Sequence, residues 1–112
     1  MIFFNVKEVK NFLLKNGEVY TTRKPSRKIG VDIAVEGSYT HPKILGLVDI
    51  KFVELITSPE QLTPYVDKSG ISSIFLWFEK AQELHKLKAL GLFHVKLLDT
   101  KPKILEKLAT ID

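Results

Sequence analysis

The sequence predicts an α+β fold, in which a mixed or barrel-like sheet carries helices on its outside. Short β-favouring segments follow one another through short polar loops, and they alternate with segments whose apolar residues recur at helical spacing. The expected order is strand, helix, three strands, two helices, strand, helix, an order typical of α+β domains. The 112 residues show no internal repeat and no linker composition, so we expect a single domain over residues 1–112.

The first half of the chain is expected to form a strand, a helix and two further strands. The apolar residues 1–4 predict the first strand, and apolar residues then recur at helical spacing over residues 5–16. Asn5, with Glu8 three residues later, is the expected N-cap of this helix. Gly17 is its expected end, because glycine tolerates the left-handed conformation. Alternating apolar residues predict the next strands over residues 19–23 and 29–36.

The second half is expected to begin with a long strand over residues 43–56. This segment is almost continuously apolar, which predicts a strand buried on both faces. Ser58 followed by Pro59 predicts the start of a short helix that ends near Gly70. A longer helix is expected from Ser72 or Ser73 to Gly91, then a strand over 92–98 and a C-terminal helix over 101–112. The apolar face of the longer helix is predicted to consist of Phe75, Phe78, Ala81, Leu84 and Leu87.

The composition limits the kinds of functional site and targeting segment that we expect in this chain. Cysteine is absent, which excludes disulfides, thiolate zinc sites and a cysteine nucleophile. His41, His85 and His94 are widely separated, so we expect no metal site and no cofactor. No apolar run has the length of a membrane span, and the first residues lack the features of a signal peptide, so we expect a cytoplasmic protein.

The strongest functional signal is a basic cluster at the end of the second predicted strand. Arg23, Lys24, Arg27 and Lys28 lie within six positions around a proline, in a chain with a net charge of +4 and a pI near 9.3. Such a cluster is typical of contact with phosphate groups, and the two arginines suit bidentate binding. A loop whose charges only keep the protein soluble is the alternative.

Strand alternation predicts which of these side chains share a surface. Thr21 and Arg23 lie on one face of their strand, as a pair lining a cleft requires, and Tyr20 lies on the other face. Asp49, inside a strand that is expected to be buried, needs a cationic partner. Arg23 is one candidate partner, and that pairing would make Arg23 a structural residue instead of a ligand group.

Aromatic residues and one histidine complete the candidate site. Tyr20 and Tyr39 are candidates for stacking on nucleobases, although tyrosine also suits the rim of a core. His41 lies near the expected cleft and is first of all a loop residue. Trp77 belongs to a helical aromatic group with Phe75 and Phe78, for which a core or a dimer contact is expected.

The order of these segments resembles the ASCH domains of the PUA-like superfamily. The resemblance covers about residues 5–98 and is carried by three stretches above all: residues 12–17 leading into 19–23, residues 31–35, and residues 44–50, with the segment 91–97 at the end. It implies a small pseudo-barrel with a cleft lined by the Thr and Arg of residues 19–23. It also implies RNA binding in translation or RNA processing, and in some branches hydrolysis of acetylated cytidine.

The sequence departs from that hydrolase branch. Thr21 matches the threonine of the branch, but its lysine position holds Glu18 or Val19 and its glutamate position falls near Gly70. A lysine base and a carboxylate that moves protons are therefore both missing at the matching positions.

These observations favour an RNA- or nucleotide-binding module with no assigned catalytic residue. Two alternatives remain open, a small hydrolase acting on a modified nucleoside or on RNA, and a protein-interaction domain with a solvated basic loop. The sequence leaves the oligomeric state open and gives no sign of a membrane partner. The predicted RNA-binding residues are Tyr20, Thr21, Arg23, Lys24, Arg27, Lys28, Tyr39 and His41.

Overall fold

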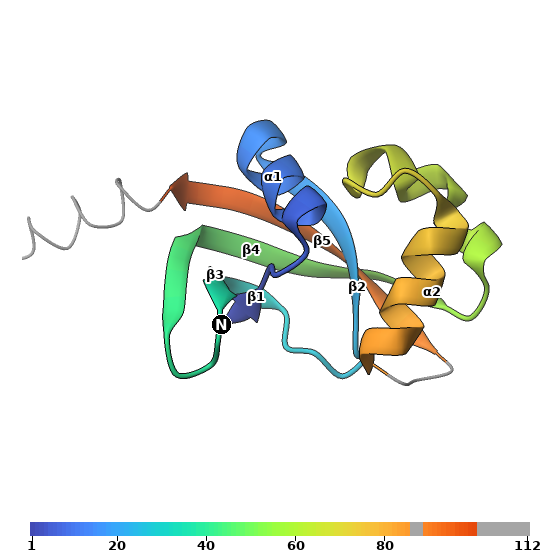
Figure 1. The fold of residues 1–112 in the computed structure, drawn as a ribbon, viewed down its shortest axis with the longest axis horizontal. Helices are drawn as coiled ribbons and strands as arrows, with labels where there is room; N and C mark the ends of the chain where they lie inside the picture. Colours follow the sequence, from blue (N-terminus) through green and yellow to red (C-terminus); the bar gives the residue numbers. More distant parts are fainter. Residues whose placement is uncertain (86–88, 101–112) are drawn as a thin grey trace, which may run out of the picture.

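The computed structural model describes residues 1–85 and 89–100, which fold around one curled sheet of five strands (Figure 1). The strands lie in the order β1-β3-β4-β5-β2, so that β1 and β2 form its two edges. β1 pairs with β3 in parallel, and every other pairing is antiparallel. This mixed sheet forms a half-barrel and confirms the expected α+β class. Its strands are β1 (Ile2–Phe3), β2 (Glu18–Arg23), β3 (Gly30–Gly37), β4 (Pro42–Ile56) and β5 (Leu90–Thr100).

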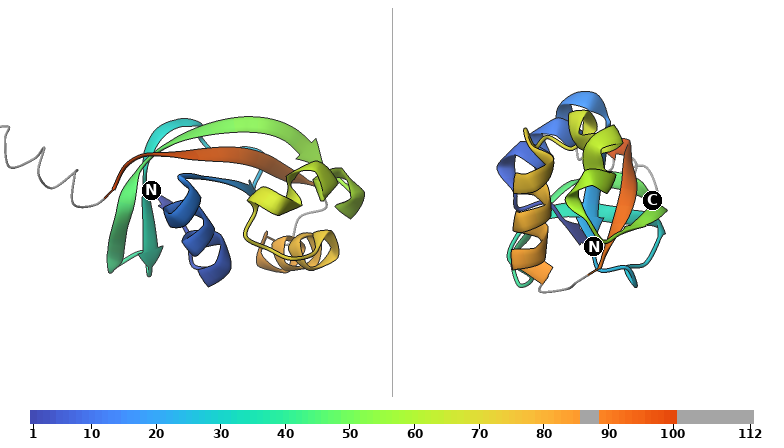
Figure 2. Two further views of the ribbon diagram at one scale, coloured as in Figure 1. Left: turned by 90° about the horizontal axis from the view of Figure 1, so that it is seen from above. Right: turned by 90° about the vertical axis from the view of Figure 1, so that its right-hand side faces the viewer.

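Three helices lie on one side of this sheet, which arches over them (Figure 2). Helix α1 (Lys7–Asn16) connects the two edge strands β1 and β2. The 3-10 helix η1 (Pro59–Lys68) and helix α2 (Ile74–His85) pack together beyond the end of α1. None of the helices in the described part of the chain has the length and apolar character needed to cross a bilayer.

Two neighbouring apolar clusters hold the helices on the sheet. In the first, Leu13 of α1 packs with Val19 and Phe93, and all three side chains are fully buried. In the second, Trp77 of α2 and Leu62 of η1 pack with residues of β4 and β5. Because each helix buries apolar side chains against the same sheet, the space between α1 and α2 is bordered by fixed elements.

The long strand β4 is not buried on both faces as its composition predicts. Phe52 and Leu55 in its second half are 46% and 47% exposed. The pairing of β4 with β3 ends at Ile50, and the helices cover one face of the sheet. An apolar strand is buried on both faces when layers cover both, and here the second layer is missing among the described residues.

Gly91 lies within β5, opposite Arg23, and does not end a helix as predicted. A Cβ atom at this position would lie 2.7 Å from the Phe93 ring and 3.1 Å from Cα of Pro25. The glycine therefore allows the β2–β3 loop to approach β5 closely.

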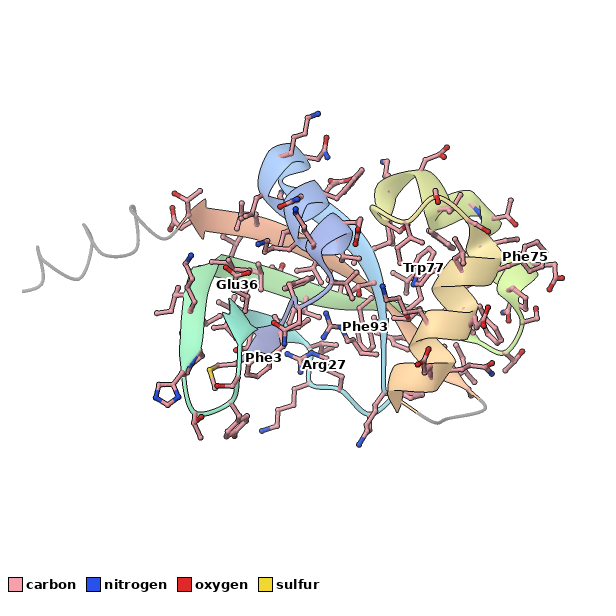
Figure 3. All side chains as sticks on the ribbon, viewed as in Figure 1. Phe3, Arg27, Glu36, Phe75, Trp77 and Phe93 are labelled. Carbon is pink, nitrogen blue, oxygen red and sulfur yellow. The ribbon has the colours of Figure 1, made fainter. Side chains whose placement is uncertain are left out.

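Among the described side chains of α2, Trp77 and Ala81 are buried, whereas Phe75 is 62% exposed, which corrects the predicted apolar face (Figure 3). Leu87, the side chain of Leu84 and the expected helix over 101–112 lie outside the described residues.

Candidate anion-binding site

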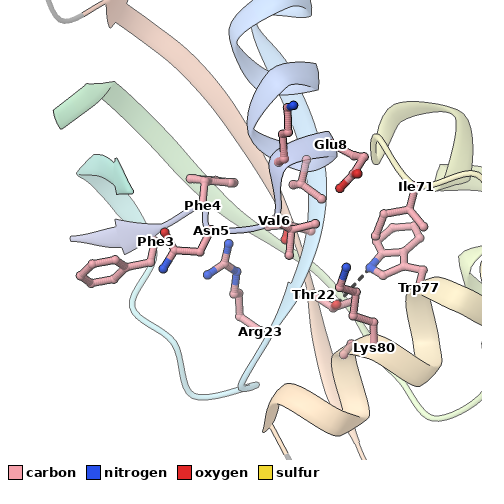
Figure 4. A pocket seen from close by; sticks show the side chains of 14 residues that line it. Phe3, Phe4, Asn5, Val6, Glu8, Thr22, Arg23, Ile71, Trp77 and Lys80 are labelled. Carbon is pink, nitrogen blue, oxygen red and sulfur yellow. Dashed lines mark hydrogen bonds between the residues drawn. The ribbon is translucent and has the colours of Figure 1, made fainter. Parts of the chain in front are cut away.

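A pocket of about 530 Å³ lies where the half-barrel remains open, between its two edge strands. One wall is the N-terminal segment from Phe3 to the first turn of α1, and the opposite wall is the end of β2 (Figure 4). Helix α2 closes a third side with Trp77, Lys80 and Ala81. The pocket is therefore built from segments that are far apart in the sequence.

Both strand edges present main-chain polar groups to this opening. The carbonyl oxygen of Gly17 accepts a hydrogen bond from β5, at 2.8 Å. In an antiparallel pair, every second residue of a strand bonds to the same neighbouring strand. Thr22 lies an odd number of positions after Gly17, so it directs its N–H and C=O away from β5. On β1, the Phe4 N–H donates to the carbonyl oxygen of Val35, at 2.8 Å, so Phe3 directs its main-chain groups away from β3. No other strand of the described sheet pairs with these two edges.

Arg23 extends from the end of β2 into the pocket (Figure 4). Its guanidinium carbon lies 5.0 Å from the centre of the Phe4 ring, a cation–π contact. Burial, with a smaller contribution from the nearby charge of Arg27, lowers the pKa of Arg23 to about 10. The side chain therefore stays charged at neutral pH, and because it is partly buried, a bound anion would be a favourable partner for it. Among the described residues, no carboxylate forms an ion pair with it.

The N-terminus of α1 lies beside this cation without a side-chain cap. The N-cap residue is Val6, and no side chain bonds to the first turn of the helix. The prediction that Asn5 caps α1 is wrong, because its amide binds Gly37 across the structure instead. Val6, Lys7, Glu8 and Val9 all line the pocket, so the positive end of the helix dipole lies at its wall.

Helix α2 is fixed to β2 by a buried hydrogen bond. The indole Nε1 of Trp77 donates to the hydroxyl of Thr22, at 3.0 Å. Lys80, one turn further along α2, borders the pocket on the same side as Trp77 (Figure 4). The charged side chains that line the pocket are Lys7, Arg23 and Lys80 against Glu8 alone, so the balance of charge favours an anion.

The remaining basic residues of the predicted cluster lie outside the pocket. Arg27 forms an ion pair with Asp32, at 3.2 Å, and donates to the carbonyl oxygen of Met1, at 3.1 Å (Figure 3). Burial lowers the pKa of Arg27, while the charge of Asp32 acts in the opposite direction. This arginine therefore joins the β2–β3 loop to the N-terminal strand. Lys24 and Lys28 are exposed on the same loop.

The structure also places the predicted aromatic residues and histidine. Tyr20 packs against Tyr65 and His94, with ring centres 4.9 Å apart in both contacts, and it does not line the pocket. Tyr39 is 80% exposed on the hairpin between β3 and β4. His41, on the same hairpin, is hydrogen-bonded through Nδ1 to the hydroxyl of Thr40, at 3.1 Å.

Asp49 is not the partner of Arg23. In the sheet register it lies between Val31 and Lys96, in the middle of β4, and it is only half-buried. Lys96 lies opposite Glu18 at the start of β2, whereas Arg23 lies opposite Gly91 at its other end, so the register keeps Asp49 away from Arg23.

Of the predicted residues, Thr21 and Arg23 therefore meet in the pocket. Sequence reasoning missed Lys80, Asn5 and the uncapped start of α1. The single local signal was the helical spacing of Lys80 from Trp77, which places them near one face.

The chain matches no model of a known protein family, and it matches neither a curated protein nor a solved structure. In the part of the chain that the structure describes, no group of three histidine or acidic side chains is placed to hold a metal ion.

Proposed function

We propose that this protein binds RNA or a nucleotide through a phosphate group held in the pocket between β1 and β2. The observation that carries the proposal is the partly buried guanidinium of Arg23 in the pocket, which has an aromatic contact but no counterion among the described residues. A phosphate would supply the missing negative charge and accept hydrogen bonds from the planar guanidinium fork.

Three neighbouring groups support an anion at the same place. The free N–H groups of the first turn of α1 suit a phosphate oxygen, as they do at other helix N-termini. Lys80 adds a second cation from α2, and the Thr21 hydroxyl lies in the same lining. The exposed Lys24 and Lys28 then contact the phosphates that follow along a strand of RNA.

A binding role is better supported than hydrolysis. Within the described residues, no carboxylate or imidazole is hydrogen-bonded to the hydroxyl of Thr21. A hydroxyl nucleophile needs an adjacent base, and Glu8, the carboxylate that lines the pocket, forms no hydrogen bond with Thr21 in the described part of the chain. The half-barrel is compatible with the ASCH-type, PUA-like module that the sequence resembles, and we propose that it acts in translation or RNA processing by binding.

A titration of fluorescein-labelled hexauridylate, followed by fluorescence anisotropy at several salt concentrations, tests the proposal. We expect affinity to fall steeply as salt rises, because each phosphate contact releases counterions. The double variant Lys24→Ala and Lys28→Ala should flatten the logarithmic salt slope by about 0.7 for each phosphate contact that it removes. Binding that does not depend on salt, or no binding at low salt, would contradict the proposal.

A further inference from the structure

An aromatic pair lies beside the phosphate pocket. The rings of Phe3 and Tyr39 stack with their centres 6.1 Å apart and their planes 25° from parallel. Phe3 also lines the pocket, and Figure 4 shows it next to Asn5 at the side where Arg23 ends. Because Tyr39 is 80% exposed, Phe3 covers one face of the tyrosine ring and leaves much of the remainder accessible to a ligand.

The hairpin that carries Tyr39 is held in place by hydrogen bonds. Asn5 donates from Nδ2 to the carbonyl oxygen of Gly37, at 3.0 Å, and accepts from the Gly37 N–H through Oδ1, at 2.7 Å. Within the hairpin, the His41 N–H donates to the Ser38 hydroxyl, at 3.1 Å. Asn5 is itself part of the pocket lining, so one residue joins the pocket to the hairpin. The main chain of the hairpin is thus held beside the pocket before a ligand binds, and the contact with Phe3 orients the tyrosine ring, which reduces the entropy lost on binding.

We propose that the Phe3–Tyr39 pair is a base-stacking subsite next to the phosphate pocket, so that the ligand is an unpaired nucleotide within a single strand of RNA. This inference rests on the phosphate-binding function proposed above. An exposed, oriented aromatic ring offers a face to any base, and stacking of this kind tolerates different base identities.

The subsite also selects between forms of RNA. In a duplex, each internal base has both faces covered by its neighbours, so it has no free face for Tyr39. A base in a single strand has a free face, and its own phosphate lies within the same nucleotide. The combination of a stacking ring and a cation in the neighbouring pocket therefore favours single strands over duplexes.

Another exposed aromatic residue provides a control. Phe75 of α2 is 62% exposed, but it does not line the pocket and the structure gives it no stacking partner among the described residues (Figure 3). Replacing it changes the exposed aromatic area without changing the proposed subsite.

The test compares three fluorescein-labelled probes by anisotropy: hexauridylate, an abasic ribose-phosphate hexamer, and a blunt RNA duplex. We expect the unchanged protein to bind hexauridylate roughly tenfold more tightly than the abasic hexamer, a typical effect of stacking one base. The duplex should bind no more tightly than the abasic hexamer. Tyr39→Ser should remove the preference, whereas Tyr39→Phe and Phe75→Ser should retain it.

The outcomes separate this inference from the function on which it rests. Equal affinity for hexauridylate and the abasic hexamer, both weakened by Arg23→Met, would overturn the base subsite and leave phosphate binding intact. Equal weakening of both hexamers by Tyr39→Ser would also overturn the subsite, since the ring would then act on the pocket and not on a base. Absence of binding to all three probes would contradict both proposals.

Discussion

The side-chain amide of Asn5 forms hydrogen bonds with both main-chain groups of Gly37, 32 positions away in the sequence. This pairing has two consequences for the candidate site. It fixes the β3–β4 hairpin against the N-terminal segment, and it leaves the first turn of α1 without a side-chain cap. The same residue therefore orders one side of the pocket and keeps N–H groups free on another.

Asn5→Ala should lower the free energy of unfolding by about 1–2 kcal/mol, because two partly solvated hydrogen bonds are lost. The control is Asn11→Ala, at an exposed position within α1. That change should leave stability equal or slightly raised, because alanine is the better helix former. Urea denaturation measures both variants. Equal stabilities of the two variants would show that the Asn5–Gly37 pair does not hold the hairpin.

The hydrogen bond from Trp77 to Thr22 should be detectable in a double-mutant cycle. Trp77→Phe removes the indole donor, and Thr22→Val removes the acceptor at a buried position. Each change should destabilise the protein by about 1–3 kcal/mol, since it leaves one buried group without its partner. The double variant should lose less than the sum of the two. If the stability lost in the double variant equals the sum of the two single losses within about 0.5 kcal/mol, the hydrogen bond does not couple α2 to β2.

Gly70→Ala should be more destabilising than Gly30→Ala, although both glycines have positive φ, 81° and 101°. A Cβ atom at Gly70 would lie 2.5 Å from the carbonyl oxygen of Glu8, whereas one at Gly30 has no neighbour within 4 Å. Both changes strain the main chain at a positive φ, so the difference between the two variants measures the steric clash at Gly70. Overpacking of this kind costs about 1–3 kcal/mol. Thermal unfolding measures the difference. Similar melting temperatures would show that the segment after η1 moves freely away from α1.

The stability of the protein should depend on the ionisation of Asp32 in acid. Burial acts to raise the pKa of this carboxyl, but the hydrogen bonds from the Met1 amino group and the Ile33 N–H, with the charge of Arg27, outweigh it and lower the pKa. The ionised carboxyl of Asp32 therefore stabilises the fold fully above the pKa that it has in the unfolded chain, about 4. This stabilisation is lost as the pH falls through the lower pKa of the carboxyl in the folded protein.

Asp32→Asn should make the melting temperature fall less steeply between about pH 5 and about pH 2, because the ionisable group is gone. Asp67→Asn, at an exposed position on η1, is the matched control and should follow the unchanged protein. Parallel curves for Asp32→Asn and the unchanged protein would rule out this linkage.

The sequence predicted those features of the fold that depend on residues close together in the chain. Gly17 ends α1 with a left-handed φ of 77°, and its N–H donates to the carbonyl oxygen of Leu13, as a glycine C-cap does. Strand alternation places Thr21 and Arg23 on one face and both line the pocket, although Thr22 of the other face lines it too, because β2 is the edge strand. Both features are decided by neighbouring residues, so they can be predicted from the sequence alone.

The remainder of the site depends on contacts between distant segments. Asn5 has the sequence context of a helix cap, but the main chain of Gly37 offers it two hydrogen bonds instead of one. Arg27 matches a phosphate-binding pattern, yet Asp32 on β3 engages it. Lys80 borders the pocket only because Trp77 fixes α2 against β2. The sequence around each of these residues does not show which of its possible partners it contacts in the folded protein.

The most direct test of the account replaces Arg23 with an uncharged residue of similar length and measures RNA binding. Arg23→Met should weaken binding of hexauridylate roughly tenfold or more, because a hydrogen bond to a charged group contributes about 1.5–3 kcal/mol. Lys51→Met, at an exposed position on β4 away from the pocket, makes the same change in net charge and should alter affinity less than about twofold. The melting temperature of Arg23→Met should change little, because the lost cation–π contact with Phe4 is offset by removal of a partly buried charge that has no counterion among the described residues. Equal affinities for the two variants, or a lower melting temperature of Arg23→Met with unchanged binding, would contradict the assignment of Arg23 as the phosphate ligand.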